Sequence, residues 1–117
     1  MKIIFYLSTC STCRKILSDW KPGKDVVLQD IKTEAISPAQ LDRMAKLAGG
    51  YEPLFSRRAL KFRGMGLQDK KLTEQDYRKL ILEEYTFLKR PVMILDNQLF
   101  IGSGSLAVAA GKKALRS

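Results

Sequence analysis

Cys10 and Cys13 are the only cysteines among the 117 residues, and they lie where one expected element ends and the next begins. The apolar run of residues 3–7 before them is typical of a buried strand, and residues 14–17 after them are typical of the opening of a helix. A Cys-x-x-Cys pair at a strand-to-helix turn is the arrangement of a redox-active dithiol. The chain is therefore expected to begin with a strand and a helix that meet at this pair.

This position favours an ionised sulfur. The free N–H groups and the positive dipole end of a helix stabilise a negative charge. Arg14 and Lys15 follow the pair and add two positive charges nearby. Such surroundings lower the pKa of a thiol from about 8.5 to roughly 3.5–7.5. We therefore predict a thiolate at neutral pH on Cys10, which is nearer to the exposed turn than Cys13.

Two other interpretations of the pair fit less well. Structural zinc takes four ligands, mostly from cysteine and histidine, and this chain has two cysteines and no histidine. A purely structural disulfide would close a very short loop, and such cross-links stabilise least. Redox or oxyanion chemistry is favoured, with no metal and no bound cofactor.

The composition narrows the class of protein. A length of 117 residues suits a single domain, 1–117, and an apolar fraction of 45% is ordinary for a folded protein. No apolar run approaches the ~20 residues of a membrane span, and residues 1–7 are too short for a secretory signal, so a cytoplasmic location is expected. The net charge of +9 suggests an anionic substrate, an acidic partner or nucleic acid. The basic residues are scattered rather than concentrated, which argues against direct nucleic-acid binding.

The remaining pattern places a set of helices between two strand-forming parts. A second strand is expected over 25–31, with an apolar centre typical of a parallel strand covered on both faces. Ser37 and Thr73 are expected to begin helices, and a further helix is expected over 57–63. Strands 92–95 and 98–101 flank a two-residue turn, and a helix over about 105–115 is expected to pack Leu106, Ala109 and Ala110 on the sheet. This order predicts an α/β, thioredoxin-like fold with a mixed four-stranded sheet, a core of 1–34 and 87–117, and a helical insertion over 35–86.

Three segments in this order resemble the ArsC/Spx family of small thioredoxin-like proteins. They are Cys-Ser-Thr-Cys-Arg-Lys at 10–15, Ser-Arg-Arg at 56–58 and Arg-Pro-Val at 90–92. The resemblance covers nearly the whole chain. It implies a cis peptide bond before Pro91 and places that proline beside the cysteines. Taken alone, Arg90-Pro91 would be interpreted as a turn that precedes a strand.

One functional type in this family is the glutaredoxin-coupled arsenate reductase. The resemblance implies that Cys10 is the nucleophile and that Arg58 and Arg90 hold an oxyanion, with Arg58 favoured over Arg57 by the spacing. The expected substrate-binding residues are Thr9, Ser11, Thr12, Arg14 and Pro91. For Arg14, a surface role is the alternative, and Ser8 and Thr9 either cap the helix or help to bind an anion. The implied external reductant is glutathione, glutaredoxin or thioredoxin.

The other type is Spx, a redox-sensing regulator that binds the C-terminal domain of the RNA polymerase alpha subunit. There the Cys-x-x-Cys pair is a disulfide switch. The arsenate reductases usually have Ser or Thr in place of Cys13, and a third arginine where this chain has Ile-Gly-Ser-Gly at 101–104. We therefore expect a thiol oxidoreductase that acts on a small oxyanion or a disulfide, in which Cys13 resolves the intermediate on Cys10. The alternative is a Spx-like regulator without enzymatic turnover.

Overall fold

The computed structural model describes residues 2–116, which divide into two compact units. The first unit comprises residues 2–35 and 90–116, and the second comprises residues 36–89. The first contains the whole sheet and both cysteines. The second, residues 36–89, contains no β-strand and has one isolated β-bridge, between Phe55 and Leu88.

The first unit is a mixed four-stranded sheet with two helices. Its elements are β1 (Lys2–Tyr6), α1 (Ser11–Trp20), β2 (Val27–Asp30), β3 (Val92–Leu95), β4 (Gln98–Ile101) and α5 (Ser105–Arg116). The strand order is β2-β1-β3-β4, in which β1 pairs parallel with β2 and antiparallel with β3, and β3 pairs antiparallel with β4. In this register Ile4 lies between Leu28 and Met93. The α/β, thioredoxin-like arrangement predicted from the sequence is confirmed.

The position of β2 differs from the expectation. The strand is parallel to β1, but it lies at the edge of the sheet, and Val27 and Leu28 are 59% and 48% exposed. The prediction that this apolar run is covered on both faces is therefore wrong. The buried strands are instead the central ones, β1 and β3. All four residues of β3 are buried.

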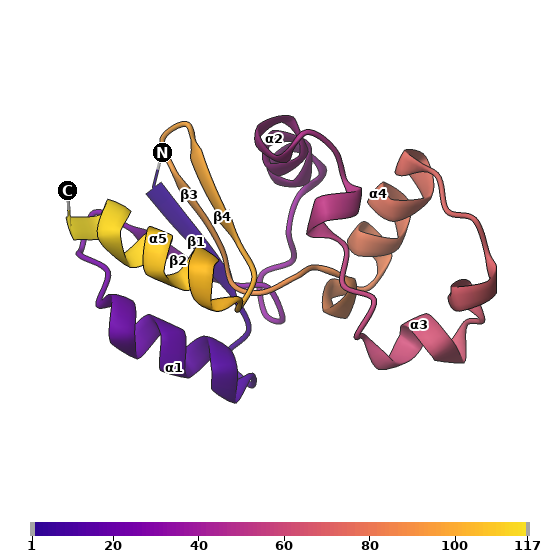
Figure 1. Ribbon diagram of the computed structural model, residues 1–117, viewed down its shortest axis with the longest axis horizontal. Coiled ribbons are helices and arrows are strands. Elements are labelled where there is room, and N and C mark those ends of the chain that lie inside the picture. Colours follow the sequence, from indigo (N-terminus) through magenta and orange to yellow (C-terminus); the bar gives the residue numbers. More distant parts are fainter. Residues whose placement is uncertain (1, 117) are drawn as a thin grey trace. The chain divides into compact units, whose positions relative to one another are not determined.

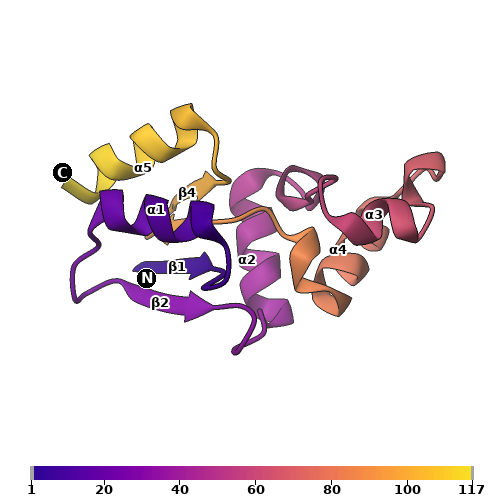
Figure 2. The same ribbon diagram turned by 90° about the horizontal axis from the view of Figure 1, so that it is seen from below.

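Helices α1 and α5 lie on the same face of the sheet (Figures 1 and 2). Ile16 and Trp20 of α1 pack with Ile4 of β1 and Met93 of β3. The indole Nε1 of Trp20 donates a hydrogen bond to the carbonyl oxygen of Val108 in α5 at 2.9 Å. This bond and the shared core join the two helices, which are far apart in the sequence.

The buried face of α5 is not the predicted one. Leu106 is 88% exposed, and Ala109 and Ala110 are also exposed. The face that packs on the core carries Val108, Gly111, Ala114 and Leu115. A Cβ atom on Gly111 would lie 2.8 Å from Cζ2 of Trp20, so the missing side chain lets the helix approach the indole closely. This helix has two weakly apolar faces, and the contact with Trp20 determines which of them is buried.

The second unit consists of short helices joined by turns. These are α2 (Pro38–Ala48), the 3-10 turn η1 (Glu52–Leu54), α3 (Leu60–Gly64), η2 (Leu67–Asp69), α4 (Glu74–Glu83) and η3 (Tyr85–Phe87). Ser37 and Thr73 cap α2 and α4, each with a reciprocal capping box. Helix α3 begins at Leu60 rather than at residue 57, because the backbone of Ala59 is not helical, with ψ 136°, and the two residues before it form a turn.

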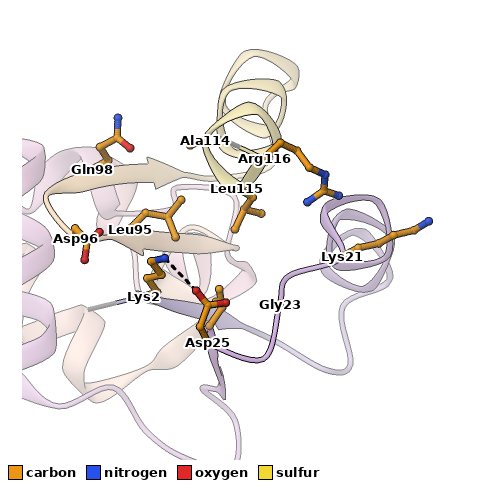
Figure 3. Close-up of a pocket in the computed structure, with 11 residues that line it drawn as sticks. Lys2, Lys21, Gly23, Asp25, Leu95, Asp96, Gln98, Ala114, Leu115 and Arg116 are labelled. Carbon is orange, nitrogen blue, oxygen red and sulfur yellow. Dashed lines mark hydrogen bonds and ion pairs between the residues drawn. The ribbon is translucent and has the colours of Figure 1, made fainter.

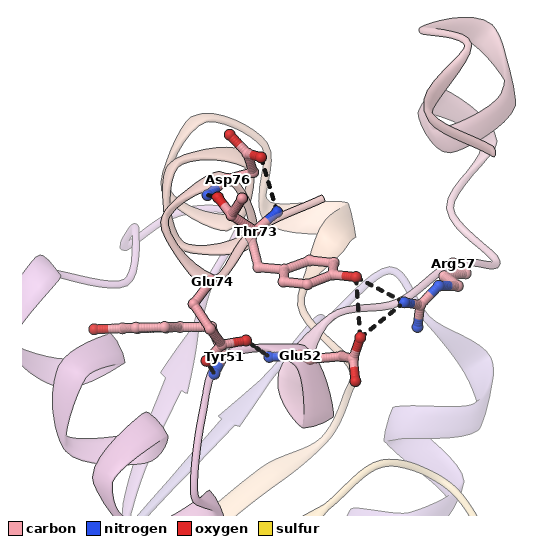
Figure 4. A network of polar contacts seen from close by, with 7 residues as sticks. Tyr51, Glu52, Arg57, Thr73, Glu74 and Asp76 are labelled. Carbon is pink, nitrogen blue, oxygen red and sulfur yellow. Dashed lines mark hydrogen bonds and ion pairs between the residues drawn. The ribbon is translucent and has the colours of Figure 1, made fainter. Parts of the chain in front are cut away.

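Aromatic packing and a polar network hold the second unit together. The ring of Phe55 stacks on Phe87 at 5.0 Å and contacts Tyr77 at 4.9 Å between ring centroids. The Glu74 carboxylate accepts hydrogen bonds from the backbone N–H groups of Tyr51 and Glu52, at 2.7 and 3.2 Å (Figure 4). Tyr77 and Phe87 are both buried, so they pack in the interior of this unit.

Candidate functional site

Cys10 is the N-cap residue of α1, at the end of the loop that follows β1. Its backbone is extended, with φ −92° and ψ 115°. Its N–H donates to the carbonyl oxygen of Leu7 at 3.0 Å, and its own carbonyl oxygen accepts from the N–H of Arg14 at 3.1 Å. The cysteine therefore lies where the helix presents N–H groups that have no partner within the helix.

These N–H groups make the Cys10 sulfur more acidic than an ordinary thiol. Partial burial alone would raise the pKa of Cys10. The backbone N–H and thiol of Cys13 and the N–H of Thr12 stabilise negative charge on its sulfur, and the positive charge of Arg90 adds to their effect. Together they outweigh the burial, so the pKa of Cys10 is held below its usual value. This is the condition for a reactive thiolate that the sequence predicted.

Cys13 has the opposite properties. It is completely buried, and burial raises the pKa of its thiol to about 11. The negative charge on Cys10 and the hydrogen bond that the Cys13 thiol donates to the Cys10 sulfur raise this pKa further. Both cysteines are free thiols in this structure. The pair is therefore one accessible, acidic sulfur in hydrogen-bond contact with one buried, protonated sulfur.

Arg90 acts on the cysteines from the segment just before β3. The Arg90–Pro91 peptide bond is cis, and Pro91 is buried. Arg90 is half-buried, and its charge lowers the pKa of both cysteines. The structure thus brings together Cys10, Cys13, Thr12 and Arg90 from two distant parts of the sequence.

The other predicted site residues are more exposed. Thr9, Ser11, Thr12 and Arg14 all have exposed side chains around the first turn of α1. The leading charge that acts on Cys10 is that of Arg90, whereas the sequence suggested Arg14 and Lys15. These exposed residues lie around Cys10, and their role in binding a substrate stays a prediction.

Arg57 and Arg58 lie in the turn before α3, in the second unit. Arg57 makes the contacts: its Nη2 donates to the Tyr77 hydroxyl at 2.8 Å and pairs with Glu52 at 3.3 Å (Figure 4). Arg58 is exposed and makes no hydrogen bond or ion pair within residues 2–116. Arg57 is therefore the arginine of this pair that has partners within the second unit, and the predicted choice of Arg58 over Arg57 for a role beside Cys10 stays a prediction.

The sequence reasoning missed Asp30. Ser8 had been considered as a helix cap or an anion ligand, but its hydroxyl donates to Oδ2 of Asp30 at 2.5 Å. Asp30 is the last residue of β2, which runs parallel to β1. Because the carboxyl ends of parallel strands meet at one edge of a sheet, an acidic residue at the end of this strand was a usable signal.

A pocket of about 410 Å³ lies elsewhere in the first unit (Figure 3). It is lined by residues at the beginning of β1, before β2, in the β3–β4 turn and at the end of α5, and Lys2 pairs with Asp25 there at 3.0 Å. Cys10 follows the opposite end of β1, so the cysteines do not line this pocket. Within residues 2–116 no three His, Cys, Asp or Glu side chains gather as metal ligands, and no helix there is long and apolar enough to cross a bilayer.

Comparison with known proteins agrees with the fold. The chain is 24% identical over 104 residues to the global transcriptional regulator Spx 2 of Bacillus anthracis, a match that covers 87% of this chain and 79% of the relative. The solution structure of an arsenate reductase (ArsC) related protein from Brucella melitensis superposes with a TM-score of 0.68 at 26% identity, over 93% of this chain and 92% of that one. Arsenate reductase from Vibrio cholerae has the same fold, with a TM-score of 0.73 at 18% identity, over 93% and 95% of the two chains.

The profile of the ArsC family matches residues 5–110. This span runs from β1 to α5 and includes both cysteines, Arg58, Arg90 and Pro91. By this match, this chain belongs to the ArsC family.

Proposed function

We propose that this protein is a thiol-dependent oxidoreductase in which Cys10 is the nucleophile and Cys13 the resolving thiol. The observation that carries the proposal is the asymmetry of the pair. Cys10 has a lowered pKa and an accessible position, and Cys13 is buried with a pKa of about 11. A nucleophile and a resolving thiol need these opposite properties, because the first must be ionised before the reaction and the second only after it.

In the first step the Cys10 thiolate attacks one sulfur of a substrate disulfide. A bond forms between Cys10 and that sulfur, the substrate S–S bond breaks, and the other half leaves as a thiolate. Cys10 then carries no negative charge. Its charge and its hydrogen bond to Cys13 were two causes of the high pKa of Cys13, so that pKa falls when the mixed disulfide forms.

In the second step the Cys13 sulfur attacks Cys10. A Cys10–Cys13 disulfide forms, the mixed disulfide breaks, and the proton of Cys13 ends on the departing thiol. Two electrons have passed from the enzyme dithiol to the substrate. Two thiols from an external reductant, such as glutathione, glutaredoxin or thioredoxin, then restore the reduced pair.

An oxyanion such as arsenate is the second substrate class under this proposal. The N–H groups at the start of α1 and the positive charge of Arg90 suit a tetrahedral anion. The Cys10 sulfur would replace one oxygen, which leaves as water. Attack of Cys13 on Cys10 would then leave the bonding electron pair on the central atom, which is reduced by two electrons.

The test uses two single variants and two substrates. Cys10→Ser is expected to abolish reduction of both glutathione disulfide and arsenate, because no other thiol is accessible. Cys13→Ser is expected to stop after the first step and to accumulate a mixed disulfide with glutathione, detectable by the mass of the intact protein. Full turnover by Cys10→Ser would refute the mechanism.

A redox-sensing regulator is the second candidate. It is supported by two relatives named as global transcriptional regulators, from Bacillus anthracis and Lactiplantibacillus plantarum, at 24% and 25% identity over 87% of this chain. In that role the Cys10–Cys13 disulfide would alter a surface that binds the C-terminal domain of the polymerase alpha subunit. Capture of that domain by the oxidised but not the reduced protein, with no turnover of either substrate, would favour the regulator over the enzyme.

A further inference from the structure

The loop that carries Cys10 is tied to the neighbouring strand by one carboxylate. Ser8 lies between the end of β1 and Cys10, and its hydroxyl donates to Oδ2 of Asp30 at 2.5 Å. Oδ1 of the same carboxylate accepts from the backbone N–H groups of Ser8 at 3.4 Å and Lys32 at 3.2 Å. One side chain at the end of β2 thus connects two loops that follow adjacent parallel strands.

Backbone hydrogen bonds on either side of Ser8 complete this connection. The N–H of Ile31 donates to the carbonyl oxygen of Tyr6 at 2.9 Å, and the N–H of Cys10 donates to that of Leu7 at 3.0 Å. Between Tyr6 and Cys10, the contacts of Ser8 with Asp30 attach the loop to the end of β2. Asp30 therefore holds the segment immediately before the nucleophile.

We propose that Asp30 is a positioning residue for the Cys10 thiolate. The hydrogen-bonding groups that stabilise this sulfur, the N–H groups of Thr12 and Cys13 and the Cys13 thiol, belong to α1, and the charge of Arg90 adds to them. Cys10 makes no side-chain capping bond to the helix, so its placement against these donors depends on the loop that precedes it. The inference rests on the proposed role of Cys10 as a thiolate nucleophile.

The charge of Asp30 and its hydrogen bonds have opposite effects on Cys10. The Ser8 hydroxyl is the main cause that lowers the pKa of Asp30, so this carboxylate is ionised at neutral pH. A negative charge near Cys10 disfavours a thiolate, whereas correct placement of the sulfur favours it. The other charged or titratable groups around the two residues are Cys13, Arg14, Lys15, Lys32 and Arg90, and none of them is altered in the variants below.

Four variants separate the effect of the Asp30 charge from the effect of its hydrogen bonds. Ser8→Ala deletes the hydroxyl and keeps the charge, and Asp30→Ala deletes both the charge and the hydrogen bonds. Asp30→Asn removes the charge but can keep all three contacts, since its oxygen accepts from the two N–H groups and its NH₂ group donates to the Ser8 hydroxyl. Asp25→Ala is the matched control, because it removes a carboxylate that lies before β2 and pairs with Lys2, at the other end of the sheet.

The measurement is the pH dependence of iodoacetamide alkylation at Cys10 in the full chain. Ser8→Ala and Asp30→Ala are expected to raise the apparent pKa of Cys10, and a rise of about half a unit slows alkylation about threefold below the pKa. Asp30→Asn is expected not to raise the pKa, because it keeps the three contacts and removes the opposing charge, and Asp25→Ala is expected to match the unaltered protein. Urea unfolding followed by the fluorescence of Trp20, the single tryptophan, shows that each variant is folded.

Two results would overturn the proposal. If Asp30→Ala and Asp30→Asn lower the pKa while Ser8→Ala leaves it unchanged, Asp30 acts on Cys10 only through its charge. If the variants lose stability but keep the pKa of Cys10, the link is merely structural. Should Asp30→Ala not fold, Ser8→Ala and Asp30→Asn still decide the question. An ordinary thiol pKa in the unaltered protein would instead refute the proposed nucleophile itself, so the two failures are distinguishable.

Discussion

Replacement of Gly111 by alanine should destabilise the protein, although alanine favours helices more than glycine does. Gly111 lies on the buried face of α5 against Trp20. An added Cβ would lie 2.8 Å from Cζ2 and 3.3 Å from Cε2 of the indole, and 3.0 Å from Cε of Met93. The Met93 methyl is the end of a flexible side chain, but the indole is fully buried and held by its hydrogen bond to Val108. The ring therefore cannot move without breaking that bond.

The two opposing contributions can be compared. Alanine in place of glycine inside a helix stabilises by about 1 kcal/mol. Forcing an extra methyl group into a well-packed core costs about 1–3 kcal/mol, and the rigid indole favours the upper part of that range. We therefore expect a net loss of about 1–2 kcal/mol in the free energy of unfolding. Ala110→Gly is the control, because Ala110 is exposed on the same helix and should lose about 1 kcal/mol through helix propensity alone.

Urea unfolding monitored by Trp20 fluorescence measures both variants with a probe that lies at the altered contact. The emission maximum of folded Gly111→Ala should also shift if the indole is displaced. A variant that is more stable than the parent by about 1 kcal/mol would show that helix propensity dominates, and the close-packing argument would be refuted.

Three further predictions concern the cysteines and the second unit. Arg90→Gln should raise the pKa of Cys10 in alkylation experiments, because the charge of Arg90 lowers it, whereas Arg14→Gln should have little effect; equal shifts would contradict the assignment. The contribution of Cys13 to stability should be complete below the pKa of an unfolded thiol and lost as the pH rises through about 11, because the folded protein holds this proton more tightly. Cys13→Ala should therefore lack that alkaline loss in urea unfolding, and an unchanged pH profile would disprove the linkage. Gly50→Ala should speed amide exchange at Tyr51 and Glu52, because a Cβ at φ +154° would lie 2.6 Å from Oε1 of Glu74, while Gly64→Ala, with open space around it, should not; similar exchange in both variants would count against this reason.

Features that depend on neighbours in the sequence were predictable. Ser37 and Thr73 begin their helices as expected, because a capping box satisfies backbone N–H groups with side chains only three residues apart. The lowered pKa of Cys10 was predictable for the same reason, since the N–H groups that cause it come from the next turn of chain.

Features that depend on distant neighbours were not predictable. The apolar centre of β2 could not reveal an edge strand, because the strand order depends on how β3 pairs with β1. Likewise, the contacts of Arg57 depend on Glu52 and on Tyr77, which lies in another helix. The spacing within 56–63 contains no information about either partner.

The sequence by itself determined the elements, their caps and a dithiol at the start of the first helix, because those features arise from contacts within a few residues. Only the tertiary structure decided which face of α5 is buried, which arginine acts on Cys10 and which carboxylate holds its loop. These choices arise from contacts between segments far apart in the chain, where close packing and charge proximity, rather than local pattern, decide which arrangement has the lower free energy.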